Sequence, residues 1–153
     1  MITLYKHSID DLWFKQSMMS DELTMSYNHA FGGTISFPKS KWESWYQKWL
    51  SDDSKYYYRY LVNEKAEFIG EIAYHYDDES CVYLTDVLIH AKYRNKGYGG
   101  IALDLLCGIA KENGISVLYD ELWNDNPAIN LFLKHGFIID KEKERTVILK
   151  KEL

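Results

Sequence analysis

Cysteine is scarce in this sequence, and long apolar runs are missing from it. The 153 residues include only two cysteines, and no run approaches the roughly 18 apolar residues of a membrane-spanning helix. Cys81 opens a predicted strand and Cys107 lies in a predicted helix, so we expect small core residues rather than a disulfide. No basic and apolar leader opens the chain. These absences predict a cytoplasmic protein with no membrane partner.

An excess of positive charge is also missing. The 18 Lys and Arg residues stand against 23 Asp and Glu residues, which gives a formal net charge of −5. Because nucleic-acid phosphates are bound by basic surfaces, nucleic acid is not expected as the main partner. This acidic balance is compatible with a cationic partner.

The chain is instead rich in hydrophobic and aromatic residues. Hydrophobic residues make up 46% and charged residues 27%, which is typical of a folded protein rather than a disordered one. With 13 tyrosines and five tryptophans, some polar ring tips must lie at the surface or line a cavity. A chain of this length without repeats, low-complexity segments or linkers is expected to form a single domain over residues 1–153.

The centre of the chain is a predicted strand, a glycine-rich turn and a predicted helix. β-Branched and aromatic residues fill Val82–Ile89, and apolar residues at helical spacing predict a helix over 98–113. Glycines in the turn let the backbone approach a ligand, and the free N–H groups at a helix start hold an anionic phosphate. The cations Arg94 and Lys96 add charge there. The turn is therefore either a phosphate site or a tight connection with solvated cations.

Two common phosphate-binding motifs do not fit this turn. A P-loop needs Lys and then Ser or Thr after its last glycine, but Gly97 is followed by Tyr98. A dinucleotide fingerprint needs a third glycine where the chain has Ala102. The Arg-x-x-Gly-x-Gly pattern of Arg94–Gly99 resembles the pyrophosphate loop of the GNAT superfamily, the Gcn5-related N-acetyltransferases. The preceding strand end, Asp86–Ile89, is similar to that superfamily's acetyl-CoA-binding strand.

A second stretch resembles the same superfamily independently. Asn124–Phe132 and Lys134–Phe137 are similar to its other signature: an Asn, an Ala, an aromatic residue and a closing Gly-Phe. The resemblance is specific over residues 81–137 and only topological outside them. It implies a single-domain α/β (α+β) GNAT fold with a mixed, mostly antiparallel central sheet of six or seven strands. About four helices would flank the sheet, and a splayed strand pair would hold acetyl-CoA.

The remaining sequence patterns predict elements that suit this fold. Ser8 and Asp11 resemble a helix N-cap and its acidic partner. This first helix would end near residues 17–20 and bury a face made of Ile9, Leu12, Trp13 and Gln16. The patterns also predict a strand over 2–6, a helix capped by Ser40, a hairpin over 56–62 and 68–76, a strand over 116–122, a helix over 126–134 with Pro127 in its first turn, and a hairpin over 137–140 and 146–149.

The segment 21–40 is long and polar, and it contains glycines and aromatic residues. Loops of this length in compact domains are usually functional or disordered, and the aromatic residues argue against disorder. In the superfamily this region helps to form the acceptor pocket. We therefore expect Tyr27, Asn28 and Phe31 to contact the acceptor, with a purely structural lid as the alternative.

An aromatic stripe follows in the second predicted helix. Trp42, Trp45, Tyr46 and Trp49 recur at i, i+3, i+4 and i+7, on one helical face. This spacing indicates either a helix that faces the core, which is the favoured interpretation, or an aromatic cage for a cationic acceptor.

The resemblance implies acetyl transfer from acetyl-CoA to an amine of a small molecule or of a protein, by direct attack in a ternary complex. Non-catalytic acyl-CoA binding and transfer of a longer acyl group are the alternatives. A monomer or homodimer without a metal site is expected. The implied cofactor-binding residues are Leu88, Ile89, Arg94, Asn95, Lys96, Gly97, Tyr98, Gly99, Gly100, Asn126 (or Asn124) and Phe132.

The acceptor amine must lose a proton, and Asp86 is the acidic residue on the cofactor strand. It shares a strand face with Leu88, so its carboxylate, or a water that it holds, is a candidate general base. A structural strand-end carboxylate is the alternative. Some polyamine acetyltransferases have an acidic pair at this point of the strand, and the first of the pair matches Thr85 here.

The expected general acid is absent from its usual position. The superfamily often has a tyrosine that protonates the leaving thiolate, and this chain has Phe132 there. Tyr119 on the intervening strand, Tyr98 or water must then serve. The thiolate can also leave unprotonated, because its pKa is modest.

Overall fold

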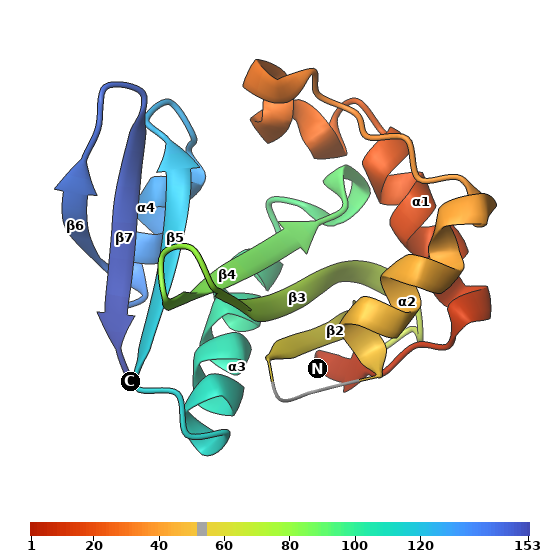
Figure 1. The fold of residues 1–153 in the computed structure, drawn as a ribbon. Helices are drawn as coiled ribbons and strands as arrows, with labels where there is room; N and C mark the ends of the chain where they lie inside the picture. The colour runs from red at the N-terminus through yellow and green to blue at the C-terminus, as the bar shows by residue number, and fades with distance from the viewer. Residues whose placement is uncertain (52–54) are drawn as a thin grey trace.

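The computed structural model describes residues 1–51 and 55–153. Within them the chain forms one sheet of seven strands. Its order is β1-β2-β3-β4-β5-β7-β6 (Figure 1). All neighbours are antiparallel except β4 and β5, which confirms the predicted mixed sheet. The strands are β1 (Thr3–Tyr5), β2 (Tyr56–Val62), β3 (Phe68–Asp77), β4 (Val82–Ile89), β5 (Val117–Trp123), β6 (Ile138–Glu142) and β7 (Thr146–Glu152).

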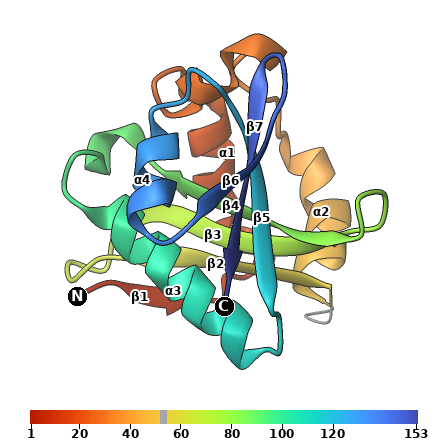
Figure 2. The same cartoon turned by 90° about the vertical axis from the view of Figure 1, so that its left-hand side faces the viewer.

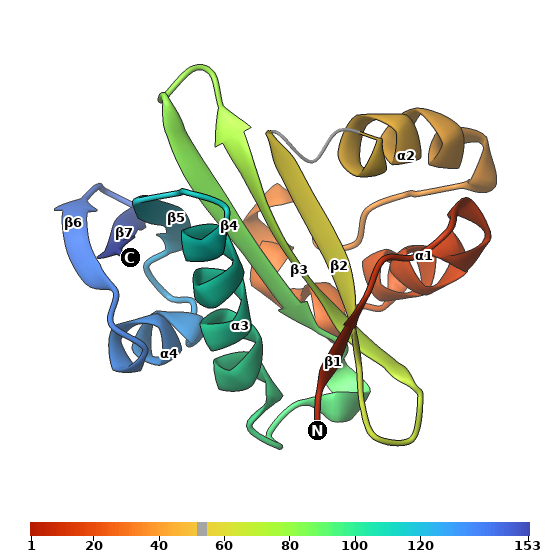
Figure 3. The ribbon, with the colours of Figure 1, turned by 90° about the horizontal axis from the view of Figure 1, so that it is seen from below.

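Helices cover both faces of this sheet. Figure 3 shows α1 and α2 on one face and α3 and α4 on the other, and in Figure 2 α3 lies along the face nearest the viewer. The α-helices are α1 (Leu12–Ser20), α2 (Trp42–Leu50), α3 (Tyr98–Glu112) and α4 (Ala128–Lys134). Short 3₁₀ helices are η1 (Ile9–Asp11), η2 (Thr24–Phe31), η3 (Lys39–Lys41) and η4 (Ala91–Tyr93). No helix in the described residues is long and apolar enough to cross a membrane.

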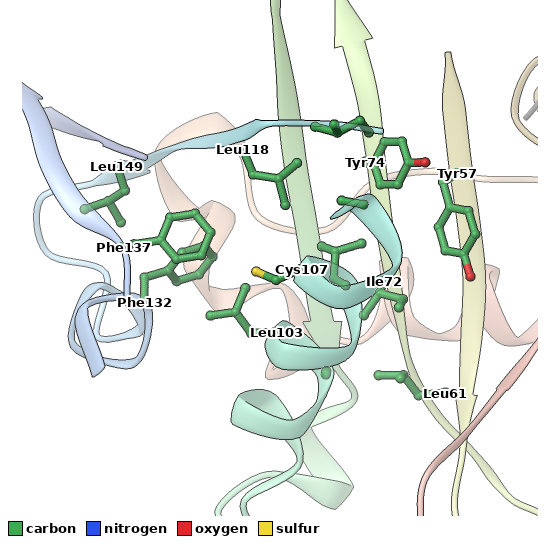
Figure 4. Packing of buried hydrophobic residues seen from close by; sticks show 14 of the residues in the cluster. Tyr57, Leu61, Ile72, Tyr74, Leu103, Cys107, Leu118, Phe132, Phe137 and Leu149 are labelled. Carbon is green, nitrogen blue, oxygen red and sulfur yellow. The ribbon is translucent and has the colours of Figure 1, made fainter. Parts of the chain in front are cut away.

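The larger core cluster lies between the sheet and the helices α3 and α4 (Figure 4). Ile72, Leu103 and Leu118 are fully buried. The rings of Phe132 and Phe137 meet edge to face, with their centroids 4.9 Å apart. Burying one such side chain contributes about 1.5–3 kcal/mol, so this cluster fixes the position of α3, including its N-terminus.

The parallel pair β4–β5 is short, and the two strands then diverge. Their register contains only Tyr83 opposite Leu118 and Leu84 opposite Tyr119. Beyond these residues β4 continues beside β3, whereas β5 continues beside β7, and Figure 1 shows the two strands separating. On the edge that faces β5, the main chain of β4 beyond Leu84 therefore has no neighbouring strand.

Most predicted elements are confirmed where the sequence pattern is regular. The hairpin of β2 and β3, the strand β4, the helix α3 and the strand β5 lie within one or two residues of the predicted bounds. The Ser8–Asp11 cap is also confirmed, because Asp11 Oδ2 accepts hydrogen bonds from Ser8 N at 3.0 Å and Ser8 Oγ at 3.2 Å.

The predicted buried face of the first helix is confirmed at Leu12, and Ile9 and Gln16 are partly buried, but it is wrong at Trp13. Trp13 is 54% exposed, whereas Phe14 and Lys15 are buried. The chain enters α1 through the 3₁₀ turn η1, which shifts the helical register that was counted from Ile9. Polar partners on the sheet then make it possible to bury the Lys15 ammonium.

Four local predictions are corrected by the structure. Ser40 lies inside η3, and Lys41 is the N-cap of α2. Pro127 is the N-cap of α4 rather than a residue of its first turn. Cys81 is exposed in the turn before β4 with φ 58°, whereas Cys107 is buried as predicted, and both thiols are free. The segment 21–40, expected as a loop, contains η2 and η3.

Candidate active site

A cavity of about 780 Å³ opens where β4 and β5 diverge. Its size is typical of a small-molecule or cofactor site. It is bounded by β4, β5, η2, and the starts of α3 and α4. The predicted site residues that line it are Tyr27, Asn28, Phe31, Asp86, Leu88, Ile89, Arg94, Asn95, Gly97, Tyr98, Gly99, Gly100, Asn126 and Phe132.

The N-terminus of α3 opens into this cavity. Asn95 and Gly97 have φ angles of 62° and 83°, and this left-handed turn directs the first residues of α3 toward the cavity. The first N–H groups of a helix lack intrahelical partners and carry the positive end of its dipole. The cavity therefore has a place that suits a phosphate group.

Packing also favours glycine at the start of α3. A Cβ on Gly99 would lie 3.0 Å from Leu131 Cδ2, and one on Gly100 would lie 2.7 Å from His135 Nε2. His135 in turn is 2.7 Å from Asp104 Oδ1, through its Nδ1 atom. The two glycines let α4 approach α3 closely, and α4 thereby forms one wall of the cavity.

Two carboxylates line the cavity beyond the point where the strands separate. Asp86 comes from β4 and Asp120 from β5, and Asp120 Oδ2 accepts a hydrogen bond from Thr85 Oγ1 at 3.0 Å. Desolvation by the surrounding protein raises the pKa of both carboxyl groups, although Asp86 is exposed to the cavity, and the charge of Asp86 raises the pKa of Asp120 further. The positive charge of Lys15 opposes the shift at Asp86 in part. The pair therefore holds a proton more readily than two isolated aspartates.

A buried ion pair lies behind these carboxylates, between α1 and β3. Lys15 Nζ donates to Glu71 Oε1 and Oε2, both at 3.3 Å, and to Tyr58 Oη at 3.0 Å. Burial raises the pKa of Glu71 to about 7, and Lys15 limits that rise. Glu71 faces Leu88 across the ladder, and Asp86 lies two residues before Leu88 on the same face.

The aromatic stripe of α2 faces this ion pair rather than the cavity. Lys15 Nζ lies 4.9 Å from the ring centroid of Trp45 and 4.8 Å from that of Tyr58. Of the stripe, Trp45 is the residue that contacts the ammonium group, together with Tyr58 of β2. The core-facing interpretation of α2 is the one that fits the structure.

The mouth of the cavity is bridged by two contacts between η2 and the β5–α4 connection. His29 Nε2 lies 3.1 Å from Asp125 Oδ2. The rings of Phe31 and Trp123 meet at an angle of 61°, with centroids 5.2 Å apart. These contacts connect η2 with the end of β5 and with the connection after it, and all four residues line the cavity.

Two of the predicted residues do not line the cavity. Lys96 is exposed outside it. Tyr119 pairs with Lys150 of β7, and strand alternation puts its side chain on the opposite face from Asp120. Tyr119 itself does not line the cavity, although Glu121 and Trp123 of the same strand face do, so its role as the acid stays a prediction. Tyr98, the alternative, does line the cavity, and Phe132 there is buried against Phe137.

The two candidate asparagines have different surroundings. Asn126 lines the cavity, and its Oδ1 accepts a hydrogen bond from Ala128 N at 2.9 Å. Asn124 instead donates from Nδ2 to Glu144 O at 3.3 Å, on the β6–β7 turn. Of the two positions, only Asn126 is placed to contact a ligand in the cavity.

Sequence reasoning missed Asp120, Lys15 and Glu71. A signal for Asp120 was present: it lies between Leu118 and Leu122 on the period-2 face of a strand, where an acidic residue is unusual. Glu71 carries the same signal, because it lies between Ile69 and Ala73 on its strand, whereas no comparable signal marked Lys15. The ion pair between Lys15 and Glu71 depends on how α1 packs across β3, and the local sequence pattern does not specify this packing.

The comparisons with known proteins agree with this geometry. A sequence profile of the Acetyltransferase (GNAT) family matches residues 18–137, most of the chain, so the chain belongs to the GNAT acetyltransferase family. This family consists of acyl-CoA-dependent enzymes with acetyl-CoA as acetyl donor. A search of curated proteins finds no match.

Solved structures of other family members share the fold. The spermidine N-acetyltransferase of Vibrio cholerae, in complex with CoA and spermine, is 16% identical with a TM-score of 0.83, over 99% of this chain and 95% of that one. The PaiA N-acetyltransferase of Thermoplasma acidophilum, in complex with coenzyme A, is 17% identical with a TM-score of 0.69, over 100% and 99%. The GNAT domain of S. lividans PAT is 14% identical with a TM-score of 0.78, over 99% and 89%. At these identities the likeness establishes the fold.

The residues of the cavity suit acetyl-CoA. The start of α3 offers helix N–H groups to a pyrophosphate, and added Cβ atoms at Gly99 and Gly100 would press on α4. The splayed edge of β4 offers main-chain groups beside Leu88 and Ile89. The individual contacts of these residues with the cofactor stay predictions.

Proposed function

We propose that this protein transfers the acetyl group of acetyl-CoA to a primary amine of a small cationic molecule, by direct attack in a ternary complex. The observation that carries the proposal is the pair Asp86 and Asp120 in the cavity. Among the described residues, neither carboxylate has a hydrogen bond to a cationic side chain. An ammonium group of the acceptor supplies the missing positive charge.

The carboxylate pair also suits the proton transfer that the reaction needs. The amine enters as an ammonium ion and must lose a proton before its nitrogen forms a bond to the acetyl carbon. Asp86 and Asp120 have raised pKa values, so the pair is a stronger base than an ordinary aspartate. The proton passes from the amine nitrogen to one carboxylate, and the neighbouring carboxylate favours its retention.

Acetyl-CoA supplies the acetyl group as an activated thioester. The chain's contribution is to hold this group beside the amine, which replaces a collision in solution by a reaction between neighbours. Main-chain groups at Leu88 and Ile89 orient the acyl end, and the start of α3 orients the phosphates. Because Phe132 has no acidic proton, Tyr98 or solvent protonates the leaving thiolate, or the thiolate leaves as the anion. The nitrogen loses its second proton as the amide forms, and that proton goes to the thiolate or to solvent.

The bridged mouth favours a small acceptor over a protein. The contacts His29–Asp125 and Phe31–Trp123 span the open end of the cavity. A slender amine passes such an entrance, whereas a folded protein surface must first displace η2. Polyamines combine slenderness with several positive charges, and a spermidine N-acetyltransferase shares the fold, so polyamines belong among the acceptors to be tested.

Release of free thiol from acetyl-CoA tests the proposal across a panel of amines. The panel compares spermidine and short diamines with monoamines of equal length, with amino acids, and with peptides that offer an α-amine or a lysine. We expect kcat/KM for the diamines or polyamines to exceed that for the matched monoamines by about tenfold or more, because the second charge meets a carboxylate. Preference for peptides would contradict the proposal, as would acetyl-CoA binding without turnover of any amine. Faster transfer from a longer acyl-CoA than from acetyl-CoA would show that the longer acyl-CoA is the preferred donor.

A further inference from the structure

The side chain of Arg94 joins the cofactor turn to the acceptor side of the cavity. Its Nε donates to Ile89 O at 3.0 Å, at the end of β4. Its Nη1 and Nη2 donate to Leu23 O at 3.0 Å and to Thr24 O at 2.7 Å. All three nitrogens of the guanidinium are thus bonded to backbone carbonyls of two segments that are far apart in the sequence.

Thr24 strengthens the same junction from the other side. Its hydroxyl accepts a hydrogen bond from Ala91 N at 2.9 Å and donates to Asp21 Oδ2 at 2.5 Å. The Asp21 carboxylate also accepts from Thr24 N at 2.9 Å. Thr24 is fully buried, so these bonds are shielded from water. The start of η2 is therefore fastened to the turn between β4 and α3 by three hydrogen bonds, and the bond from Arg94 Nε to Ile89 O holds the guanidinium in place.

The fastened segment is the one that carries the predicted acceptor contacts. Residues 21–31, called here the acceptor segment, include Tyr27, Asn28 and Phe31, which line the cavity. Arg94 itself is the first residue of the Arg-x-x-Gly-x-Gly loop, whose glycines begin α3. One side chain thus connects the backbone beside the phosphate site with the backbone that covers the acceptor end.

We propose that Arg94 is a positioning residue that holds the acceptor segment over the cavity and couples it to the cofactor loop. The forked guanidinium is essential for this role, because it reaches two successive carbonyls and Ile89 O at the same time. A lysine keeps the charge but offers a single ammonium, which does not reproduce the three bonds. The expected effect on acceptor kinetics rests on the proposed function, whereas the effect on the acceptor segment itself does not.

Backbone amide hydrogen exchange of residues 24–31 tests this role without any acceptor. In Arg94→Lys these amides are expected to exchange about tenfold faster or more than in the wild type, while the amides of β3 are unchanged. Lys92→Gln is the matched control, because it removes an exposed cation two residues away and leaves the Arg94 bonds in place. Its exchange is expected to equal that of the wild type. Unchanged exchange in Arg94→Lys would overturn the proposal.

A second pair of variants keeps the test decisive if Arg94→Lys folds poorly. Thr24→Val removes the hydroxyl bonds to Ala91 and Asp21, whereas Thr24→Ser retains a hydroxyl. Faster amide exchange of residues 24–31 in Thr24→Val, with wild-type exchange in Thr24→Ser, supports the proposal that these hydrogen bonds hold the acceptor segment. Equal exchange in both variants and the wild type contradicts it.

Kinetics then separate positioning from phosphate binding. With an active amine, Arg94→Lys is expected to raise the acceptor KM about tenfold and to leave the acetyl-CoA dissociation constant within about twofold. Weakened acetyl-CoA binding with an unchanged acceptor KM would instead assign the side chain to the phosphates. If no amine is turned over, the proposed function fails, and the exchange measurements still decide the role of Arg94.

Discussion

His7 is a buried imidazole whose two nitrogens have no hydrogen-bond partner among the described residues. It is 1% exposed and stacks on the ring of Tyr60, with centroids 3.9 Å apart. Burial lowers the pKa of His7 to about 3, and the charge of Lys15 adds to this shift. The imidazole is therefore neutral and acts as an aromatic ring in the α1–α2 side of the core.

His7 makes the free energy of unfolding sensitive to acid. Its folded pKa of about 3 lies below the unfolded value of about 6.5, so the unfolded state takes up the proton first as the pH falls. The stability that His7 contributes is complete above pH 6.5 and is lost as the pH falls toward 3. His7→Phe keeps a ring on Tyr60 and removes the titration. Between pH 7 and pH 5 the wild type is expected to lose about 2 kcal/mol relative to this variant, measured by urea unfolding. Parallel stability profiles would contradict this assignment.

At the scale of single elements, we expect cofactor binding to depend on α3. Its first N–H groups open into the cavity, and Gly99 lies in that first turn. Gly99→Glu should abolish acetyl-CoA binding in calorimetry, because a carboxylate would project into the pyrophosphate site. An acidic residue in the first turn is favourable for the helix itself, so the fold is expected to persist.

Gly99→Ala is the matched control for this change. It adds the same Cβ, 3.0 Å from the flexible end of Leu131, without the charge. We expect Gly99→Ala to bind acetyl-CoA more tightly than Gly99→Glu by at least about tenfold. Wild-type affinity in a folded Gly99→Glu protein would show that the phosphates bind elsewhere.

Elements with a regular pattern were predictable, and irregular ones were not. Alternating and helical spacings are local, so β2, β3, β4 and α3 were placed from the sequence. The structure of η2 depends on Arg94 and Thr24, whose partners lie about 70 residues apart in the chain. Ser40 and Pro127 were assigned from cap preferences alone, and a 3₁₀ turn or a one-residue shift was enough to change their positions.

The cavity lining was predicted better than its chemistry. Motifs placed the glycines of α3, Asp86 and Phe132 around one ligand because these residues lie in continuous stretches. Asp120 was missed because its role comes from the separation of β4 and β5, which is a property of the sheet. Tyr119 was chosen by strand membership, and the direction of its side chain was not considered.

At the scale of the whole molecule, the parts of the proposed site surround the space where β4 and β5 separate. β4, the start of α3, η2 and the carboxylates of Asp86 and Asp120 line one cavity. We propose that β4 and α3 form its cofactor side and η2 its acceptor side. The cavity's acidity agrees with the net charge of −5 in attracting a cationic acceptor. In the proposed arrangement, the acceptor amine lies beside both the carboxylate that takes its proton and the acetyl group that it attacks.

The most direct test of this account is the rate of acetyl transfer by Asp86→Asn, with melting temperature and acetyl-CoA affinity measured on the same preparation. A general base at Asp86 predicts a fall in kcat/KM of about 10²–10⁴-fold, with acetyl-CoA affinity and folding nearly unchanged. Asp120→Asn, prepared in parallel, reports whether the neighbouring carboxylate shares the proton. A stably folded Asp86→Asn protein with full activity, alone and combined with Asp120→Asn, would remove both carboxylates from the reaction and contradict the account.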